Sequence, residues 1–432
     1  AAEEYFKLMQ ATMPTGMGAK QFFTLASSGM YLMRGELDTA QRAAAEAVDY
    51  FNETGWGLGA AMSYNAVALF AVLKQDYAAA RQAIASTLEI AKPYNSSWME
   101  FQSNILLALC YLREGNKADA SDHLRAAMLL GREKGFRNYQ LWWSPDLMAE
   151  IFSFALEQDI ESAYVTEFIN RRKLVAPSNA GSRWPWPLRI TTLGGFCIFK
   201  NGDPIKFERK AQKRILEVIK AIAAAGGRGV SLDKLSTQLW EDADGDRAHN
   251  HCYVALHRAR NLLEMDQALI VSEGKVSFNS SLIWFDVWEL NRLASDLEKQ
   301  APEAHALAAL VQQLSSLYQG TFLEGDSNEQ WVLEQREKLA NRFYRAVNQL
   351  GEYCEKLNQD ALAMRLYNSA LDQLAPPESL YLRLMQCHQR AGHYAEALTV
   401  YERFERRAAA TKLAPSAKIK ALREQLEKQV RG

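Results

Sequence analysis

Cysteine is scarce in this sequence and is not arranged for cross-linking. The chain has 432 residues and five cysteines, Cys110, Cys197, Cys252, Cys354 and Cys387, with no CxxC spacing among them. An odd and scattered set argues against a disulfide framework or a zinc ribbon, and it is typical of a reducing cytoplasm. We therefore expect a cytoplasmic protein.

Long apolar runs and targeting signals are also missing. No stretch approaches the roughly 18 apolar residues of a membrane-spanning helix, and no secretory signal peptide is present. We expect no membrane partner. The sequence opens "AAEEYFKLMQ" without an initiator methionine, so we expect a part of a longer chain or a processed terminus.

Neither sign of charge is in excess over the whole chain, whose formal net charge is −1. The distribution is nevertheless uneven. Residues 1–176 have 16 basic and 20 acidic side chains (−4), residues 188–279 have 14 and 11 (+3), and residues 280–432 have 19 and 20 (−1). The middle segment is therefore the part expected to meet an anion.

The first 176 residues repeat with a period of forty. Each repeat has an apolar-periodic segment, a polar turn such as "RGELDTA", "KQDYAAA" or "EGNKADA", and a second, alanine-rich segment. This pattern predicts pairs of helices stacked into a tetratricopeptide-like α-solenoid. The corresponding positions are Ala40, Ala80 and Ala120, then Ala44, Ile84 and Leu124, then Val48, Leu88 and Met128.

Residues 281–432 repeat with a period of thirty-four, which is the tetratricopeptide length. "NQDALAMRLYNSAL" aligns with "GHYAEALTVYERF" and pairs Tyr367 with Tyr401. Both repeat regions can be plain scaffold or can form a concave surface for a peptide or ligand, and no residue decides between these alternatives.

A different pattern begins after the Pro- and Trp-containing linker at residues 177–187. Residues 188–280 alternate apolar and polar side chains in "LRITTLGGFCIFKNGDPIKFE", then show three helical segments, then a hairpin pattern in "LIVSEGKVSFN". Ser231 is placed to cap the second helix. Strands, three helices and a hairpin predict a winged helix-turn-helix. The expected fold is mainly α: solenoid, winged helix and a second tetratricopeptide-like domain.

The third helix of this segment, residues 247–264 around "HNHCYVALHRARNLLE", has two distinct faces. At about 100° per residue, Cys252, Leu256, Ala259 and Leu263 share the core side. The opposite side carries hydrogen-bond donors and no acid, which suits the base edges of a DNA major groove. The predicted base-reading residues are Arg247, Asn250, Val254, His257, Arg258 and Asn261.

Phosphate contacts are expected around that helix. They would come from the start of the first helix and from the tip of the wing, and they would set register rather than read sequence. The residues are Arg209, Lys210, Lys213, Arg214 and Lys275.

Two catalytic or metal interpretations of the same stretch are weaker. A metal site would use His249, Cys252 and His257, but Cys252 faces the core and His257 faces away from it, which makes shared ligation hard. A Cys–His nucleophile would lack oxyanion donors and an orienting acid. We expect no enzyme activity, no catalytic residue, no metal and no cofactor.

The order of elements resembles known transcription regulators. Residues 188–280, with "YVALHRARNLLE", resemble the OmpR-type winged helix of antibiotic-regulatory (SARP-type) activators. Residues 281–432, with "WFDVWELNRL", "LYQGTFLEGDSNEQWVLEQREKL" and "SLYLRLMQCHQRAGHYAEALTVYERF", resemble the bacterial transcriptional activator domain. Residues 1–176 look like the helical repeats of large maltose-regulator-like (STAND) ATPase activators.

The resemblance implies a sequence-specific activator in the bacterial cytoplasm, at the nucleoid. It would bind direct repeats of double-stranded DNA as a homodimer and contact RNA polymerase. Two features depart from the pattern: the winged helix follows a solenoid, and no GxxxxGK[ST] phosphate loop is present. The alternative function is a protein-interaction scaffold whose winged helix binds a protein instead of DNA.

Overall fold

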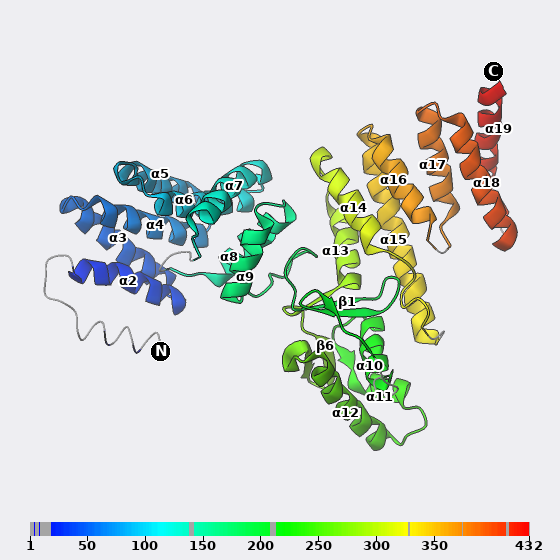
Figure 1. The fold of residues 1–432 in the computed structure, drawn as a ribbon, viewed down its shortest axis with the longest axis horizontal. Helices are drawn as coiled ribbons and strands as arrows, with labels where there is room; N and C mark the ends of the chain where they lie inside the picture. Colours follow the sequence, from blue (N-terminus) through cyan, green and yellow to red (C-terminus); the bar gives the residue numbers. More distant parts are fainter. Residues whose placement is uncertain are drawn as a thin grey trace. The chain divides into compact units, whose positions relative to one another are not determined.

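The structure, a computed structural model, describes residues 19–137, 142–207, 213–326, 329–373, 375–411 and 414–431, together with Glu4 and Leu8. Its contacts divide the chain into two compact units, residues 1–185 and 186–432 (Figure 1). Helices dominate both units, which confirms the mainly α prediction. Among the described residues, no helix is both long enough and apolar enough to cross a membrane.

Unit 1 is a stack of paired helices whose contact positions are the repeated ones. Ala40, Ala80 and Ala120 are each 0% exposed, so successive helices approach closely where a larger side chain would hold them apart. Of the nine repeated positions, eight are buried and Leu88 is half-buried. The helices are α2 (Ala19–Met33), α3 (Leu37–Glu53), α4 (Gly57–Leu73), α5 (Tyr77–Ala91), η1 (Lys92–Tyr94), α6 (Ser97–Arg113), α7 (Lys117–Lys134), α8 (Pro145–Glu157) and α9 (Ser162–Arg172).

The turns inside the helix pairs repeat as well. Gly35, Gln75 and Gly115, forty residues apart, each have a positive φ (76°, 63° and 85°) that reverses the chain between the two helices of a pair. Asp76 then caps α5 by accepting a hydrogen bond from Ala79 N at 3.0 Å. Asn116 caps α7 in the same way, and this repeated turn chemistry explains the forty-residue period.

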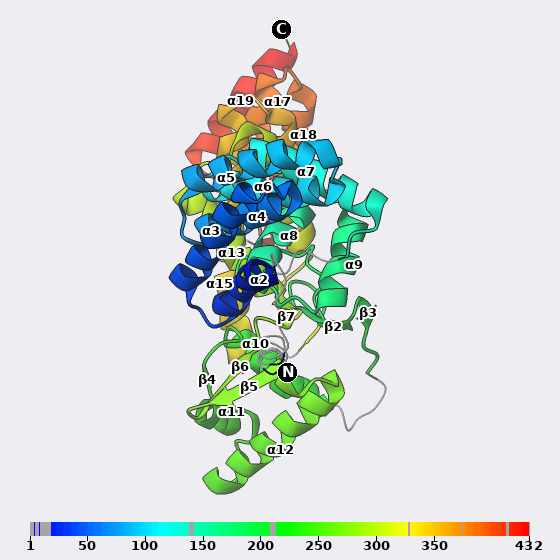
Figure 2. The same ribbon diagram turned by 90° about the vertical axis from the view of Figure 1, so that its left-hand side faces the viewer.

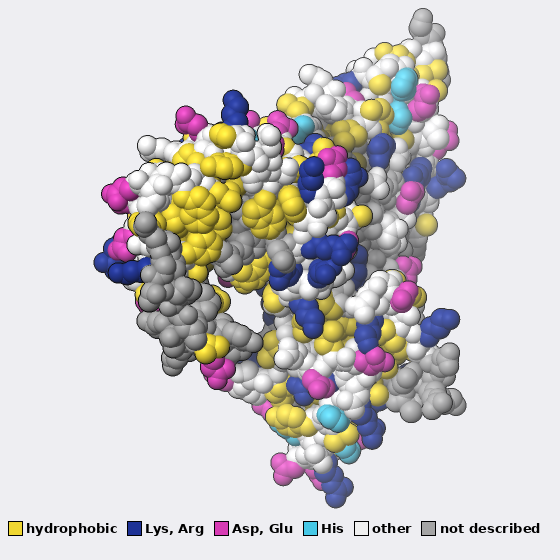
Figure 3. Space-filling model, turned by 60° about the vertical axis from the view of Figure 1, so that its left-hand side comes forward, with side chains coloured by type: hydrophobic (Ala, Val, Ile, Leu, Met, Phe, Trp, Pro, Cys, Tyr) yellow, Lys and Arg dark blue, Asp and Glu magenta, His cyan; other side chains and the backbone are white. Residues whose placement is uncertain are grey.

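Unit 1 also exposes apolar rings. Figure 3 shows hydrophobic side chains gathering over the solenoid helices. Phe22, Trp56 and Tyr94 are 39%, 42% and 52% exposed, and the rings of Phe22 and Trp56 lie 5.7 Å apart. Gly57 lies directly beneath the Tyr94 hydroxyl, where an added Cβ would be 2.7 Å away.

Unit 2 begins with a winged helix. Its first sheet has the order β3-β2-β1-β7, in which β1 runs antiparallel to β2 and parallel to β7. The second sheet, β4-β6-β5, contains the wing hairpin. The elements are β1 (Leu188–Thr191), β2 (Cys197–Lys200), β3 (Asp203–Pro204), α10 (Lys213–Ala224), β4 (Val230–Ser231), α11 (Leu232–Leu239), α12 (Gly245–Leu263), η3 (Asp266–Ala268), β5 (Leu269–Ser272), β6 (Lys275–Phe278) and β7 (Ile283–Phe285).

The rest of unit 2 is a run of helices that packs on the winged helix. One continuous apolar core extends from β1 to the last helix. In its C-terminal part, Gly351 leaves room for Tyr367, whose hydroxyl donates to Glu355 at 2.6 Å. The helices are α13 (Asp286–Lys299), η4 (Ala304–Ala306), α14 (Leu307–Leu317), α15 (Gln330–Lys356), α16 (Asp360–Leu371), α17 (Glu378–Arg390), α18 (Tyr394–Thr411) and α19 (Ala417–Arg431).

A buried carboxylate joins the first sheet to the C-terminal helices. Asp286, the first residue of α13, accepts hydrogen bonds from the backbone N–H of Thr192, from its hydroxyl at 2.8 Å and from Leu193 N at 2.7 Å. Burial raises the pKa of Asp286 to about 6, and these donors oppose the rise. The turn after β1 is thereby tied to the start of α13.

The segment 318–326, hereafter the strap, makes a second tie. Leu323 N donates to Thr192 O at 2.7 Å, and Glu324 N donates to Gly194 O at 2.8 Å. Asp326 forms an ion pair with Lys220 of α10. Residues from 281 onward therefore contribute strand β7 to the first sheet, hydrogen-bond to the turn after β1 and share the core of the winged helix. The domain boundaries at 176/177, 187/188 and 280/281 stay predictions.

Candidate nucleic-acid interface

Helix α12 lies at one end of unit 2, beside α11 and the wing and away from α16 to α19 (Figures 1 and 2). It starts within the acidic stretch 241–246, hereafter the acidic connection, whose last residue Asp246 lies in the first turn of the helix and complements its dipole. Glu264 ends it in a left-handed conformation (φ 49°) and forms an ion pair with Lys200 of β2. Both ends of α12 are thus defined.

The two predicted faces of α12 are present. Cys252, Leu256, Ala259 and Leu263 are at most 1% exposed and form part of the unit 2 core. The six predicted base-reading residues, Arg247, Asn250, Val254, His257, Arg258 and Asn261, are all exposed. Val254, the apolar member, is 42% exposed. The face therefore has the geometry for groove entry, and its contact with bases stays a prediction.

The three histidines of the stretch lie in three different surroundings. His249 Nε2 lies 2.8 Å from Asp233 Oδ1 of α11, which ties the two helices together. The His251 ring lies 6.2 Å from the Trp240 ring, and His257 contacts Asn261 one turn later at 3.5 Å. The three side chains do not converge on a common point.

Cys252 is separated from all three histidines by its burial. Burial raises the pKa of its thiol to about 11, so the thiolate that a metal or a nucleophilic reaction needs is disfavoured. Among the described residues, no group of three or more His, Cys, Asp and Glu side chains is placed to hold a metal ion.

The predicted phosphate contacts surround α12 unequally. Lys213 and Arg214 are exposed in the first turn of α10, and Lys275 is exposed at the start of β6. The Arg214 guanidinium lies 5.2 Å from the centre of the Trp240 ring and pairs with Glu217 at 2.7 Å. Its charge is therefore partly engaged, whereas Arg209 and Lys210 lie outside the described residues.

The wing is fixed to α12 by an arginine that was not among the predicted contacts. Arg260 donates from Nε (3.1 Å) and Nη2 (2.8 Å) to the carbonyl oxygen of Leu269, the first residue of β5. Gly274 has a φ of 69° at the turn between β5 and β6, which brings Lys275 opposite Ser272. The position of Lys275 relative to α12 is consequently set by backbone contacts.

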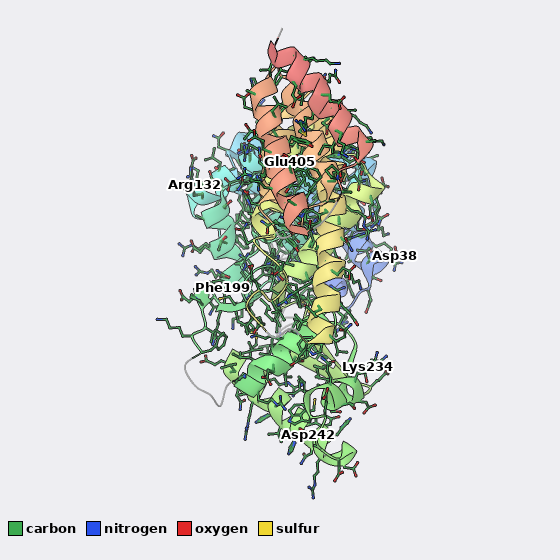
Figure 4. All side chains as sticks on the ribbon, turned by 90° about the vertical axis from the view of Figure 1, so that its right-hand side faces the viewer. Asp38, Arg132, Phe199, Lys234, Asp242 and Glu405 are labelled. Carbon is green, nitrogen blue, oxygen red and sulfur yellow. The ribbon has the colours of Figure 1, made fainter. Side chains whose placement is uncertain are left out.

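Sequence reasoning missed two side chains of this surface, His251 and Trp240, although it predicted their neighbour Arg214. His251 is exposed on α12 with its ring 6.2 Å from the half-buried Trp240 ring, and the Arg214 guanidinium lies 5.2 Å from the centre of the same indole. A helical projection centred on the exposed face omits flanking positions, so neighbours from α10 and α11 were needed to find them. Lys234 of α11 and Asp242 of the acidic connection lie at the same end of unit 2 (Figure 4).

Comparison with known proteins identifies one part of unit 2. Residues 285–427 match the family described as "Bacterial transcriptional activator domain", which confirms the resemblance predicted for residues 281–432. Comparison with curated proteins finds no match.

Two solved structures are similar to the chain. EmbR of Mycobacterium tuberculosis, in complex with a low-affinity phosphopeptide, is 17% identical over 56% of this chain and 66% of its own, with a TM-score of 0.40. The tetratricopeptide domain of P58(IPK) is 12% identical over 95% of this chain and 98% of its own, with a TM-score of 0.21. From the family match, the chain carries a bacterial transcriptional activator domain that starts at the end of β7 and closes within α19.

Proposed function

We propose that this chain is a sequence-specific DNA-binding transcriptional activator whose α12 enters the major groove. The observation that carries the proposal is the exposed α12 face, which has donors and no acid, in a winged helix joined to an activator domain. A major groove is about 12 Å wide and admits one α-helix. Binding to direct repeats as a homodimer, RNA polymerase contact and a nucleoid location belong to the same proposal.

The base contacts follow from side-chain chemistry. Arg258 and Arg247 have planar guanidinium groups that match guanine O6 and N7, and Asn250 or Asn261 can pair with adenine N6 and N7. Val254 can meet a thymine methyl group. The contact between His257 and Asn261 holds two members of this face beside each other.

The backbone contacts follow from the flanks. Lys213 and Arg214 lie at the start of α10, which precedes α12 in the chain, and Lys275 lies on the wing, which follows it. Basic side chains are therefore available on both of these elements. We include His251 and Trp240 as further contacts to the sugar-phosphate chain on the α10 side, because they adjoin Arg214. Arg209 and Lys210 keep the phosphate role predicted from sequence.

Salt dependence tests the backbone contacts. Each phosphate that a cation neutralises releases counterion, so Lys213→Gln should weaken binding to every duplex and lower the slope of log K against log salt by about one. Lys338→Gln, which removes an exposed charge from α15, is the matched control and should change neither quantity. An unchanged slope for Lys213→Gln, or salt-insensitive binding by the wild type, would remove the support for a DNA interface.

A protein-interaction scaffold is the second candidate. The exposed rings of Phe22, Trp56 and Tyr94 favour it, because contiguous apolar surface marks interaction sites. Charge reversal at Lys213 and Arg214 separates the two functions. It should abolish DNA binding if unit 2 reads DNA, and it should leave complexes formed through unit 1 unchanged.

A further inference from the structure

The C-terminal helices line a small, partly open cavity that the DNA interface does not use. It lies between the α16–α17 connection and α18 and has a volume of about 200 Å³. Figure 4 marks α18 by the exposed residue Glu405. The lining residues are Ala375, Pro376, Glu378, Tyr381, Phe404, Arg407, Ala408 and Thr411.

The floor of the cavity is aromatic and rigid. Tyr381 and Phe404 are 1% and 2% exposed, and their rings lie 5.3 Å apart at an interplanar angle of 59°. Ala408, at 4% exposure, completes the apolar surface. Because these side chains are packed into the core of unit 2, the floor of the cavity is apolar and fixed in position.

Arg407 gives this cavity a positive charge that the described residues do not neutralise. The neighbouring Arg403, one turn earlier on α18, pairs with Asp372 at 2.8 Å and donates to Leu371 O. No carboxylate of the described residues pairs with the half-buried Arg407. Burial raises the pKa of the Tyr344 phenol, and the charge of Arg407 opposes that rise.

The one acidic group of the lining is already engaged. Glu378 accepts a hydrogen bond from Ser416 N at 3.2 Å and another from the Ser416 hydroxyl. The rim above it is strained, because Ala375 has a φ of 56°. Non-glycine residues held in this region cluster at ligand sites and turns, and the Pro376–Pro377 pair that follows limits relaxation.

We propose that this cavity binds a small monocarboxylate whose apolar part is a six-membered ring or a group of similar size. The carboxylate meets the Arg407 guanidinium, whose planar fork matches two carboxylate oxygens. The apolar body rests on Tyr381 and Phe404. A cavity of about 150 Å³ holds benzene, so one of about 200 Å³ has room for a ring with a carboxylate attached.

Calorimetric titration of the full chain with sodium benzoate tests the proposal, with benzyl alcohol as the uncharged probe of similar size. Arg407→Gln removes the charge, and Arg406→Gln removes the adjacent exposed charge from the same helix as the matched control. We expect saturable benzoate binding to the wild type and to Arg406→Gln with the same Kd. We expect benzoate to bind Arg407→Gln at least about tenfold more weakly than it binds the wild type. We expect benzyl alcohol to bind the wild type more weakly than benzoate by the same factor.

Two results would overturn the proposal. The first is an absence of saturable benzoate binding by the folded wild type. The second is an equal Kd for benzoate in Arg407→Gln and wild type at unchanged melting temperature. If Arg407→Gln does not fold, benzyl alcohol binding to the wild type as tightly as benzoate would overturn it instead. None of these readouts depends on DNA binding.

Discussion

Arg258 and Arg260 lie two residues apart on α12 and have opposite surroundings. Arg258 is exposed on the face that bears Asn250 and Val254, whereas Arg260 is half-buried and donates two hydrogen bonds to Leu269 O of the wing. The same residue type therefore has a proposed recognition role at one position and an architectural role at the other.

Alanine substitution should separate these two arginines. Arg258→Ala should weaken binding to the preferred duplex by about 1–3 kcal/mol and relax the preference at one base pair, with no change in melting temperature. Arg260→Ala should lower the melting temperature, because the wing loses its tie to α12. Thermal melts and anisotropy titrations measure both. Equal effects of the two substitutions on affinity and stability would contradict this assignment.

Asp286 should make stability fall as pH rises through its titration. The pKa of Asp286 is about 6 in the folded chain, above the ordinary value of 3.8 for an aspartate, so the folded state binds a proton that the unfolded state has released. The contribution is present below the unfolded pKa and is lost above the folded one. Between pH 4.5 and 7 we expect a loss of about 2 kcal/mol relative to Asp286→Asn.

Urea unfolding of the wild type and of Asp286→Asn at both pH values measures this difference. The comparison cancels the other carboxylates of the chain, which change little between the two proteins. A difference in unfolding free energy that is independent of pH would show that Asp286 stays ionised throughout, which would contradict its raised pKa.

The directions of the α12 side chains could be predicted from the sequence, but their contacts with neighbouring elements could not. Periodicity alone placed Cys252 in the core and Arg258 on the surface, because a regular helix fixes the direction of each side chain. The pairing of Arg214 with Glu217 and Trp240, and the tie from Arg260 to the wing, depend on packing between elements, which no single periodicity encodes.

The strap, residues 318–326, ties the C-terminal helices to the winged helix. It hydrogen-bonds to the turn after β1, and Arg336 of α15 donates to the carbonyl oxygens of Phe322 (2.8 Å) and Leu323 (2.6 Å). Gly320 lies so close to Gly194 that an added Cβ would be 3.0 Å from the Gly194 Cα. The strap is therefore held by backbone hydrogen bonds to the turn after β1 and by the Arg336 side chain of α15.

A methyl group at Gly320 should loosen this connection. Gly320→Ala should lower the unfolding free energy of unit 2 by about 1–3 kcal/mol, because backbone must shift to admit the Cβ. Gly195→Ala, in the same turn as Gly194, has nothing within 4 Å of its added Cβ and is the matched control. Denaturant unfolding measures both, and equal stabilities of the two variants would contradict a tight strap.

Elements with a periodic pattern or a turn signal were predicted, and strand β7, which has neither, was not. The forty-residue repeat led to the paired helices of unit 1, and the wing followed from its Glu273-Gly274 turn. Strand β7 has three residues, Ile283–Phe285, without polar alternation, so nothing in the sequence assigned it to the first sheet. The "YQGTFLEGD" run carried the family resemblance, and nothing in it predicted the hydrogen bonds of the strap to the turn after β1.

At the scale of the molecule, the winged helix and the activator domain share one core. A domain that ends at residue 280, as predicted, lacks β7, Asp286 and the strap, which all contact the winged helix. Residues 186–432 should therefore fold alone and melt in one cooperative transition, whereas residues 188–280 should be unstable. Calorimetry of the two fragments measures this, and two separate transitions for residues 186–432 would contradict a shared core.

Selection of bound duplexes from a fragmented bacterial genome, with wild type and Arg258→Ala in parallel, tests the central claim most directly. If α12 reads sequence, the wild type will enrich a repeated motif and Arg258→Ala will lose the preference at one position of it. The spacing of the repeats would then report the arrangement of the protomers. The same fragments recovered by both proteins, or no enrichment from folded samples, would contradict the account.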